Sequence, residues 1–187
     1  ITIASALIQG SHAAYYAFAS ITWQVSGLGG LTIAGLWALG VVAEIVVFAL
    51  SPRFTVSPVL LVIIGASSAV VRWLVTAQDP SLAVLVTVQL MHGLTYGATL
   101  LGTMGLLVRN VPSHVAARAQ GYLAACSGIV TSSASILSGV VYAQHGQGVY
   151  YLMAAMGAVG GIVIGLARHR GDGPPEPDQP QSSTSGG

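Results

Sequence analysis

Residues 31–50 read LTIAGLWALGVVAEIVVFAL, an unbroken apolar run that contains one ionisable side chain, Glu44. A helix needs about 20 apolar residues, each rising 1.5 Å, to cross the hydrocarbon core of a bilayer. The run has this length and no period of two, so it does not resemble the alternating strands of a membrane barrel. It therefore predicts a transmembrane α-helix.

The same pattern recurs along the chain between turn signals rich in Gly, Pro, Ser and Asp. The expected spans are 1–22, 31–50, 56–76, 82–108, 116–143 and 149–167. We therefore expect an all-α, polytopic membrane protein whose six-helix bundle occupies residues 1–168. Residues 169–187 are rich in Pro, Ser and Gly, a composition that cannot bury apolar surface, so we expect a disordered cytoplasmic tail there.

Composition excludes a soluble domain and a nucleic-acid partner. The 187 residues are 53% hydrophobic and 6% charged, whereas soluble domains carry about 25% charged residues. Six arginines, no lysine and five acids leave a net charge of +1, without the basic cluster that nucleic acid requires. The 24 glycines suit closely packed membrane helices, and the single cysteine, Cys126, excludes an intrachain disulfide.

The arginines predict the orientation, because cytoplasmic loops of membrane proteins carry an excess of Lys and Arg. Five of them fall on one side of the predicted spans: Arg53, Arg109, Arg118, Arg168 and Arg170. Only Arg72 lies toward the other side. With six spans, both termini of this segment are expected in the cytoplasm. The chain begins with Ile1 and no charged segment precedes its first apolar run, so we expect no signal peptide and a start in mid-protein.

Glu44 is the only acid within an expected span, and it shares a helical face with Ile33, Trp37 and Gly40. A charged carboxylate in hydrocarbon costs several kcal/mol on insertion scales. One interpretation is a proton carrier or substrate contact, and the other is a carboxylate that only fixes helix packing. The free-energy cost of placing the Glu44 carboxylate in hydrocarbon favours the functional interpretation over the packing one.

Two further expected spans carry polar stripes, each within an arc of roughly 80°. The stripe of residues 1–22 comprises Ser5, Gln9, His12, Tyr16 and Ser20. That of residues 82–108 comprises Gln89, His92, Tyr96, Thr99 and Thr103, with a GxxxG pair, Gly93 and Gly97, on another edge. Both stripes predict faces that line a polar cavity, although a single histidine is more often a packing residue. The GxxxG pair predicts close contact with a neighbouring helix.

The stripe of residues 116–143 consists mainly of Ser and Thr, which can bond to carbonyls of their own helix, so close packing is favoured over a cavity lining there. Ser127 on this stripe suggests an intramembrane serine protease as a competing hypothesis. The glycine expected two residues earlier is Ala125, and the last span offers no histidine. That last span has no polar side chain beyond its start and is expected to face lipid.

Arg72 lies about one turn from the end of its span, beside Trp73. It could extend to the interface next to an aromatic anchor. It could also point inward and bind an anionic substrate or pair with Glu44. Ionisable groups on several helices are typical of secondary transporters, and no metal site or cofactor is expected.

Several segments resemble the bacterial phenylpropionate permease group of the major facilitator superfamily, which is related to the lactose and nucleoside proton symporters. The matching segments are QGSHAAYY (9–16), WQ (23–24), LWALGVVAE (36–44) and VRW (71–73). The resemblance spans residues 5–168. It implies the C-terminal half, helices seven to twelve, of a twelve-helix transporter in the bacterial inner membrane, with the N-terminal six-helix half and the lipid bilayer as partners.

The resemblance also implies roles for individual residues. Glu44 takes the place of the substrate-binding glutamate of the lactose permease relative, and Arg72 and His92 take those of an arginine facing a histidine. Thr95 stands where that relative has a proton-carrying carboxylate, which leaves Glu44 or a group of the other half as the carrier.

The implied substrate is a small aromatic carboxylate such as 3-phenylpropionate, taken up with a proton as the coupling ion. Tyr16, Trp37 and Tyr96 are expected to form an aromatic wall, and Arg72 to meet the carboxylate. A sugar or nucleoside symporter is the alternative, and a scaffold subunit without transport is a third reading that the aligned stripes disfavour.

Overall fold

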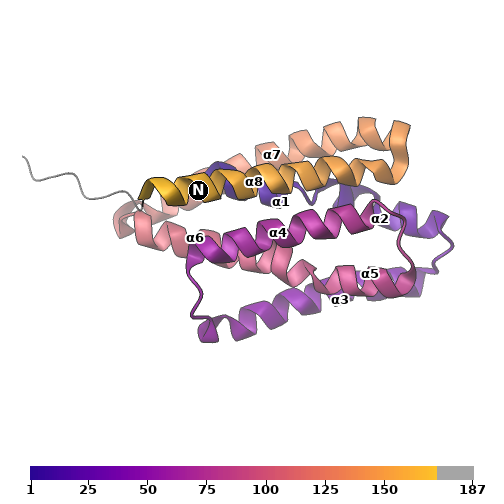
Figure 1. Cartoon of the computed structure of the whole chain (residues 1–187), viewed down its shortest axis with the longest axis horizontal. Coiled ribbons are helices and arrows are strands. Elements are labelled where there is room, and N and C mark those ends of the chain that lie inside the picture. The colour runs from indigo at the N-terminus through magenta and orange to yellow at the C-terminus, as the bar shows by residue number, and fades with distance from the viewer. Residues whose placement is uncertain (172–187) are drawn as a thin grey trace, which may run out of the picture.

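The computed structural model describes residues 1–171, with side chains through residue 167. This part of the chain is built from α-helices joined by short connections, which confirms the all-α class (Figure 1). The α-helices are α1 (Thr2–Gly10), α2 (Ala13–Val25), α3 (Gly30–Leu50), α4 (Pro58–Thr76), α5 (Leu82–Leu90), α6 (Thr99–Asn110), α7 (Ala116–His145) and α8 (Val149–Gly171). Helix α8 includes the first three residues of the expected tail, and residues 172–187 lie outside the described part.

Within the described residues, four helical stretches are long and apolar enough to cross a membrane. They are Gly30–Arg53, Pro58–Thr76, Leu82–Asn110 and Ser113–Ala167, the last of which contains both α7 and α8. Their ends agree with the expected spans to within a few residues, because the Pro, Gly and Ser turn signals do interrupt the helices.

The prediction of one continuous helix over residues 1–22 is wrong. Helix α1 ends at Gly10 and α2 begins at Ala13. The Ser11 hydroxyl donates to the Ile8 carbonyl at 2.6 Å, and His12 Nδ1 lies 3.2 Å from the Gln9 carbonyl oxygen. These side chains take up carbonyls that helical N–H groups would otherwise bond, so the chain can change direction without leaving them unpaired.

The expected span 82–108 is also irregular. Between α5 and α6 lies η2 (Gly93–Ala98), a π-helical segment. Such wide turns occur mostly as single insertions within α-helices, and frequently at functional sites. The first irregular stretch contains His12 and the second directly follows His92.

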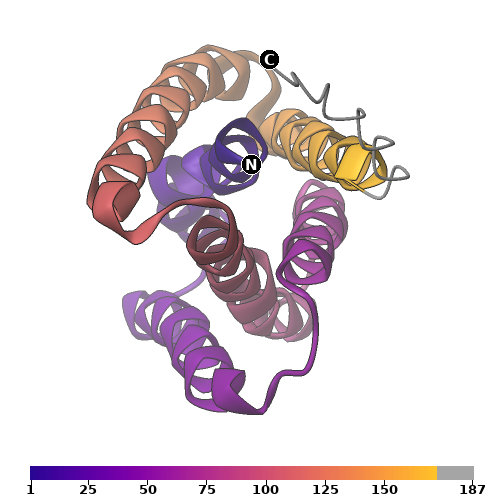
Figure 2. The same cartoon turned by 90° about the vertical axis from the view of Figure 1, so that its left-hand side faces the viewer.

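The helices form a bundle in which α4 packs against α8 and α6, α1 packs between α7 and α8, and α3 packs against α5 and η2. Viewed along the bundle, α3 and α7 lie apart on either side of the central α1 and α6, while α4 and α8 lie together on another side (Figure 2). Helix α8, expected to face lipid, buries Tyr150 and Met153 in the core and exposes Val159 and Ile162.

Connections alternate between the two ends of the bundle. The α3–α4 and α6–α7 connections and the end of α8 lie at one end (left in Figure 1), and the α4–α5 and α7–α8 connections lie at the other. Arg53, Arg109 and Arg118 belong to elements that meet at the first end, whereas Asp79 belongs to the opposite end.

Candidate functional site

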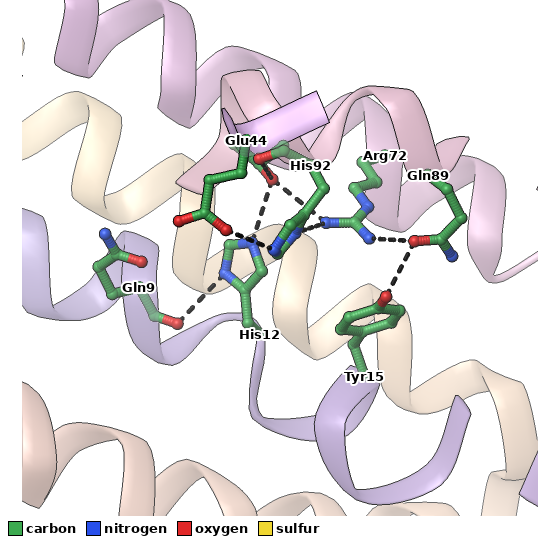
Figure 3. Close-up of polar contacts among 8 residues, drawn as sticks. Gln9, His12, Tyr15, Glu44, Arg72, Gln89 and His92 are labelled. Atoms are coloured by element: carbon green, nitrogen blue, oxygen red, sulfur yellow. Dashed lines mark hydrogen bonds and ion pairs between the residues drawn. The ribbon is translucent and has the colours of Figure 1, made fainter. Parts of the chain in front are cut away.

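Arg72 lies at the centre of a buried polar cluster. Its side chain is fully buried within the bundle, so it does not extend to the interface as one interpretation of the sequence held. Helix α4 carries it inward, where Nη1 donates to His92 Nδ1 at 2.8 Å and to Thr95 Oγ1 at 3.2 Å. Nη2 donates to Gln89 Oε1 at 3.1 Å (Figure 3). A buried arginine is tolerated in a membrane bundle when polar groups of neighbouring helices satisfy it.

His92 lies between Arg72 and Glu44. Because a guanidinium only donates hydrogen bonds, His92 Nδ1 must accept, and the proton of the neutral ring then sits on Nε2. Nε2 faces Glu44 Oε2 at 3.7 Å. A direct pairing of Arg72 with Glu44, one of the alternatives that the sequence leaves open, is not formed, because His92 lies between the two side chains. Glu44 has 21% of its side chain exposed and His92 only 7%, so the carboxylate is the accessible end of this series.

Thr95 of η2 and His12 extend the cluster to the break between α1 and α2, where His12 lies. His12 Nδ1 lies within 3.3 Å of two backbone carbonyls, which can only accept, so Nδ1 carries the proton and Nε2 accepts. Nε2 lies 3.1 Å from Thr95 Oγ1. The threonine hydroxyl accepts from Arg72, and its single proton has two acceptors within reach, His12 Nε2 and the His92 carbonyl oxygen at 3.3 Å.

Gln89 and Tyr15 complete the surroundings of Arg72. Gln89 Oε1 accepts from both Arg72 and the Tyr15 hydroxyl, the latter at 2.9 Å. The guanidinium carbon lies 4.6 Å from the ring centroids of Tyr15 and of Trp73, a distance typical of cation–π contacts. Tyr15 does not fall on the polar stripe that the sequence predicts, because that stripe assumes a continuous helix and the break after Gly10 changes its phase.

The aromatic residues expected to line a wall lie on the accessible side of the cluster. The Tyr16 and Trp37 rings are stacked with centroids 6.2 Å apart, and Trp37 Nε1 donates to Ser20 Oγ at 2.9 Å. Tyr96 lies away from Trp37 and stacks on His92, with centroids 5.5 Å apart. The three rings therefore belong to two separate stacked pairs, Tyr16 with Trp37 and Tyr96 with His92.

The GxxxG pair packs as expected, and it sets the position of Glu44. A Cβ at Gly93 would lie 2.5 Å from the Ala43 carbonyl oxygen of α3, and one at Gly97 would lie 3.3 Å from Val47. The absence of side chains at these two positions lets η2 approach the α3 backbone directly. This approach brings Glu44 to His92.

A cavity of about 480 Å³ lies between α1, α6 and α7, next to the cluster. Gln9, Tyr16 and Tyr96 line it, together with Gln120 and Ser127 of α7. The structure therefore places Glu44, His12, His92, Arg72 and Gln89 in one contiguous cluster, while Gln9 faces the adjoining cavity. Among the described residues, no group of three or more His, Cys, Asp or Glu side chains could hold a metal ion.

Comparison with known proteins gives a family match and a relative for this chain. The model of the MFS_1 like family matches residues 1–153. The chain is 35% identical over 150 residues to a protein of Escherichia coli (strain K12) named "Probable 3-phenylpropionic acid transporter". The matched region covers 79% of this chain and 40% of that relative, so the chain spans well under half the length of the protein it resembles. No solved structure matches the chain.

Proposed function

The chain belongs to the MFS_1 like family of transporters, and on this premise we propose that it forms the six-helix half of a proton-coupled symporter for a small aromatic carboxylate. Membership in this transporter family rules out the intramembrane protease suggested by Ser127. The contact between Glu44 Oε2 and His92 Nε2 at 3.7 Å carries the proposal.

Proton coupling is inferred from the way this contact is built. When Glu44 is ionised, its charge attracts the N–H of His92, whose other nitrogen accepts from Arg72. A proton on Glu44 removes that charge and weakens the attraction at the accessible end of the cluster. The protonation state of one partly exposed carboxylate thereby changes the forces on a buried arginine. We propose Glu44 as the proton carrier, because Thr95 beside Arg72 is not ionisable.

Substrate class is inferred from the aromatic side chains and the relative. Tyr16 and Trp37 stack on each other and Tyr96 stacks on His92, and aromatic faces of this kind suit an aromatic ligand. The relative's name specifies 3-phenylpropionic acid. A sugar or nucleoside remains the alternative substrate class, since the cluster also offers neutral hydrogen-bonding groups.

The remaining half and the orientation are part of the same proposal. We count α1 with α2 as one broken span and α5, η2 and α6 as another. Together with α3, α4, α7 and α8 as single spans, this gives six. The ends that carry Arg53, Arg109 and Arg118 are assigned to the cytoplasm of a bacterial inner membrane. An N-terminal six-helix half would then complete the transporter, as expected for transporters built from repeats.

Uptake of radiolabelled 3-phenylpropionate by cells producing the full-length polypeptide tests this function. We expect accumulation that a protonophore abolishes and that excess unlabelled aryl acid, but not uridine or a galactoside, inhibits. Glu44→Gln should lose accumulation, and Asp79→Asn, which changes a carboxylate outside the spans, should keep it. Uptake that is unchanged by the protonophore would reject proton coupling, and inhibition by uridine or the galactoside alone would favour the alternative substrate.

A further inference from the structure

The cavity between α1, α6 and α7 has an uncharged wall that is rich in hydrogen-bond donors. Its volume of about 480 Å³ is within the usual range for small-molecule sites. Among the described residues that line it, none is charged, and every polar side chain is a Ser, Thr, Tyr or Gln. Each of these side chains can donate an O–H or N–H bond. An anionic ligand in this cavity would therefore have to be held by neutral donors.

Arg72 does not supply a cation to this cavity. Its side chain is fully buried, Nη1 donates to His92 and Thr95, and Nη2 donates to Gln89. Its Nε has no hydrogen-bond partner, but this atom is shielded as well. The Tyr96 ring lines the cavity and stacks on His92, with centroids 5.5 Å apart. A ligand in the cavity therefore meets the tyrosine, and the guanidinium lies behind other side chains.

Gln9 turns its amide nitrogen, and not its amide oxygen, to open space. Its Oε1 is shielded from solvent and has no hydrogen-bond partner, whereas Nε2 is left open. Figure 3 shows the amide oxygen turned toward the cluster and the nitrogen turned away from it. In the reverse orientation the shielded atom would be a nitrogen with two unsatisfied N–H donors, which costs more than one unsatisfied oxygen. Because Gln9 lines the cavity, the group that it offers to a ligand there is an N–H donor.

We propose that this cavity receives the oxygen atoms of an aryl carboxylate through neutral donors, with Gln9 Nε2 as the specificity-determining one, and not through Arg72. The inference rests on the proposed function, which supplies the aryl acid as ligand, and deepens it by naming what recognises the acid group. A neutral N–H donates to a carboxylate oxygen and to a carbonyl oxygen alike. The cavity therefore selects an acceptor oxygen rather than a charge, and an uncharged ketone of the same shape should bind.

Calorimetric titration of the purified full-length polypeptide tests this inference with three ligands of similar shape. 3-Phenylpropionate has an anionic acceptor, 4-phenylbutan-2-one has a neutral carbonyl acceptor, and butylbenzene has no acceptor. We expect both the acid and the ketone to bind. Each ligand is compared between protein variants, rather than with the other ligands, so that differences in partition into detergent cancel.

Variants of Gln9 assign the recognition to this side chain. Gln9→Met keeps the length and removes the donor, so the affinity for the ketone should fall about tenfold while that for butylbenzene stays the same. Gln9→Glu keeps the shape but introduces a carboxylate, so at pH 8 the affinity for 3-phenylpropionate should fall further, because like charges repel. Unchanged binding of butylbenzene shows that the cavity is intact in both variants. Gln24→Met, at an exposed glutamine outside the cavity, is the matched control.

An unchanged affinity for the ketone in Gln9→Met would overturn the inference. Binding of 3-phenylpropionate without binding of the ketone would also overturn it, because the ligand would then be recognised by its charge. So would an equal loss of ketone and butylbenzene binding in both Gln9 variants, because Gln9 would then act through the shape of the cavity. Failure of the uptake assay with an intact effect of Gln9→Met on the ketone would instead reject the proposed symport and leave the site in place.

Discussion

Arg72 Nη1 lies 2.8 Å from His92 Nδ1, and both groups are buried in the bundle. This contact joins α4 to the point where α5 passes into the π-helical segment, and it fixes which nitrogen of His92 faces Glu44. A partly exposed carboxylate is thereby connected to a buried arginine by a single imidazole. Neutral acceptors, rather than a direct ion pair, bond both Nη atoms of the arginine, while its buried Nε has no hydrogen-bond partner.

Replacing Arg72 with lysine should show that this role depends on the fork of the guanidinium. Lysine keeps the charge, but its compact ammonium cannot donate to His92, Thr95 and Gln89 in the same geometry. We expect Arg72→Lys to lower stability by about 2 kcal/mol and to abolish accumulation. Thermal unfolding in detergent measures the first effect, with Arg53→Lys in the α3–α4 connection as the control. An Arg72→Lys protein with unchanged melting and uptake would show that the fork is dispensable.

Thr95 should depend on its hydroxyl and not on its shape. Thr95→Val is nearly isosteric but leaves His12 Nε2 and one Arg72 donor without their partner. The expected loss of stability is about 1–3 kcal/mol, and Thr95→Ser should recover most of it. Equal melting temperatures for the valine and serine variants would show that the hydroxyl bridge contributes nothing.

Gly93 should tolerate no side chain, in contrast to Gly35 on the facing helix. A methyl group at Gly93 would lie 2.5 Å from the Ala43 carbonyl oxygen, so α3 would have to move away and take Glu44 with it. We expect Gly93→Ala to cost about 1–3 kcal/mol, as for an overpacked contact, and to lose transport. Gly35→Ala, with nothing within 4 Å of its Cβ, should be neutral or slightly stabilising. Thermal unfolding of the Gly93→Ala and Gly35→Ala variants measures this difference. Equal melting temperatures would contradict the close packing of Gly93 against α3.

Periodicity and turn signals predict most of the helix ends, because apolar length and Pro-Gly-Ser interruptions are local properties of the chain. They also place Glu44, His12 and His92 on inward faces, since polar side chains in apolar helices avoid lipid. The GxxxG pair correctly predicts a close helix contact. The inward direction of Arg72 is left open by the sequence, because its position near a span end suits both alternatives.

The break at Ser11 and His12 and the π-helical segment after His92 could not be predicted in this way. The break is stabilised by contacts between distant residues: Trp73 Nε1 of α4 donates to Ser11 Oγ at 3.0 Å, and His12 bonds to Thr95 across the bundle. A helical wheel drawn through the break therefore includes Tyr16 and omits Tyr15. Tyr16 is about half exposed, whereas Tyr15 is 2% exposed and contacts Arg72.

The proposed orientation predicts which connections a membrane-impermeant maleimide labels in intact cells. In a Cys126→Ser background, a cysteine at Ser81 in the α4–α5 connection should react from outside, because this end of the bundle lacks the arginine excess. A cysteine at Ser57, beside the α3–α4 connection, should react only after the cells are permeabilised. The reverse pattern would invert the orientation.

Simultaneous movement of protons and substrate tests the central claim most directly. Proteoliposomes containing the full-length polypeptide, without an imposed gradient, are mixed with 3-phenylpropionate while the external pH is recorded. We predict that substrate entry raises the external pH, that a protonophore abolishes this rise, and that Asp79→Asn shows it while Glu44→Gln does not. Substrate entry with no change in external pH, or an undiminished rise in Glu44→Gln, would contradict the assignment of a proton symporter with Glu44 as its carrier.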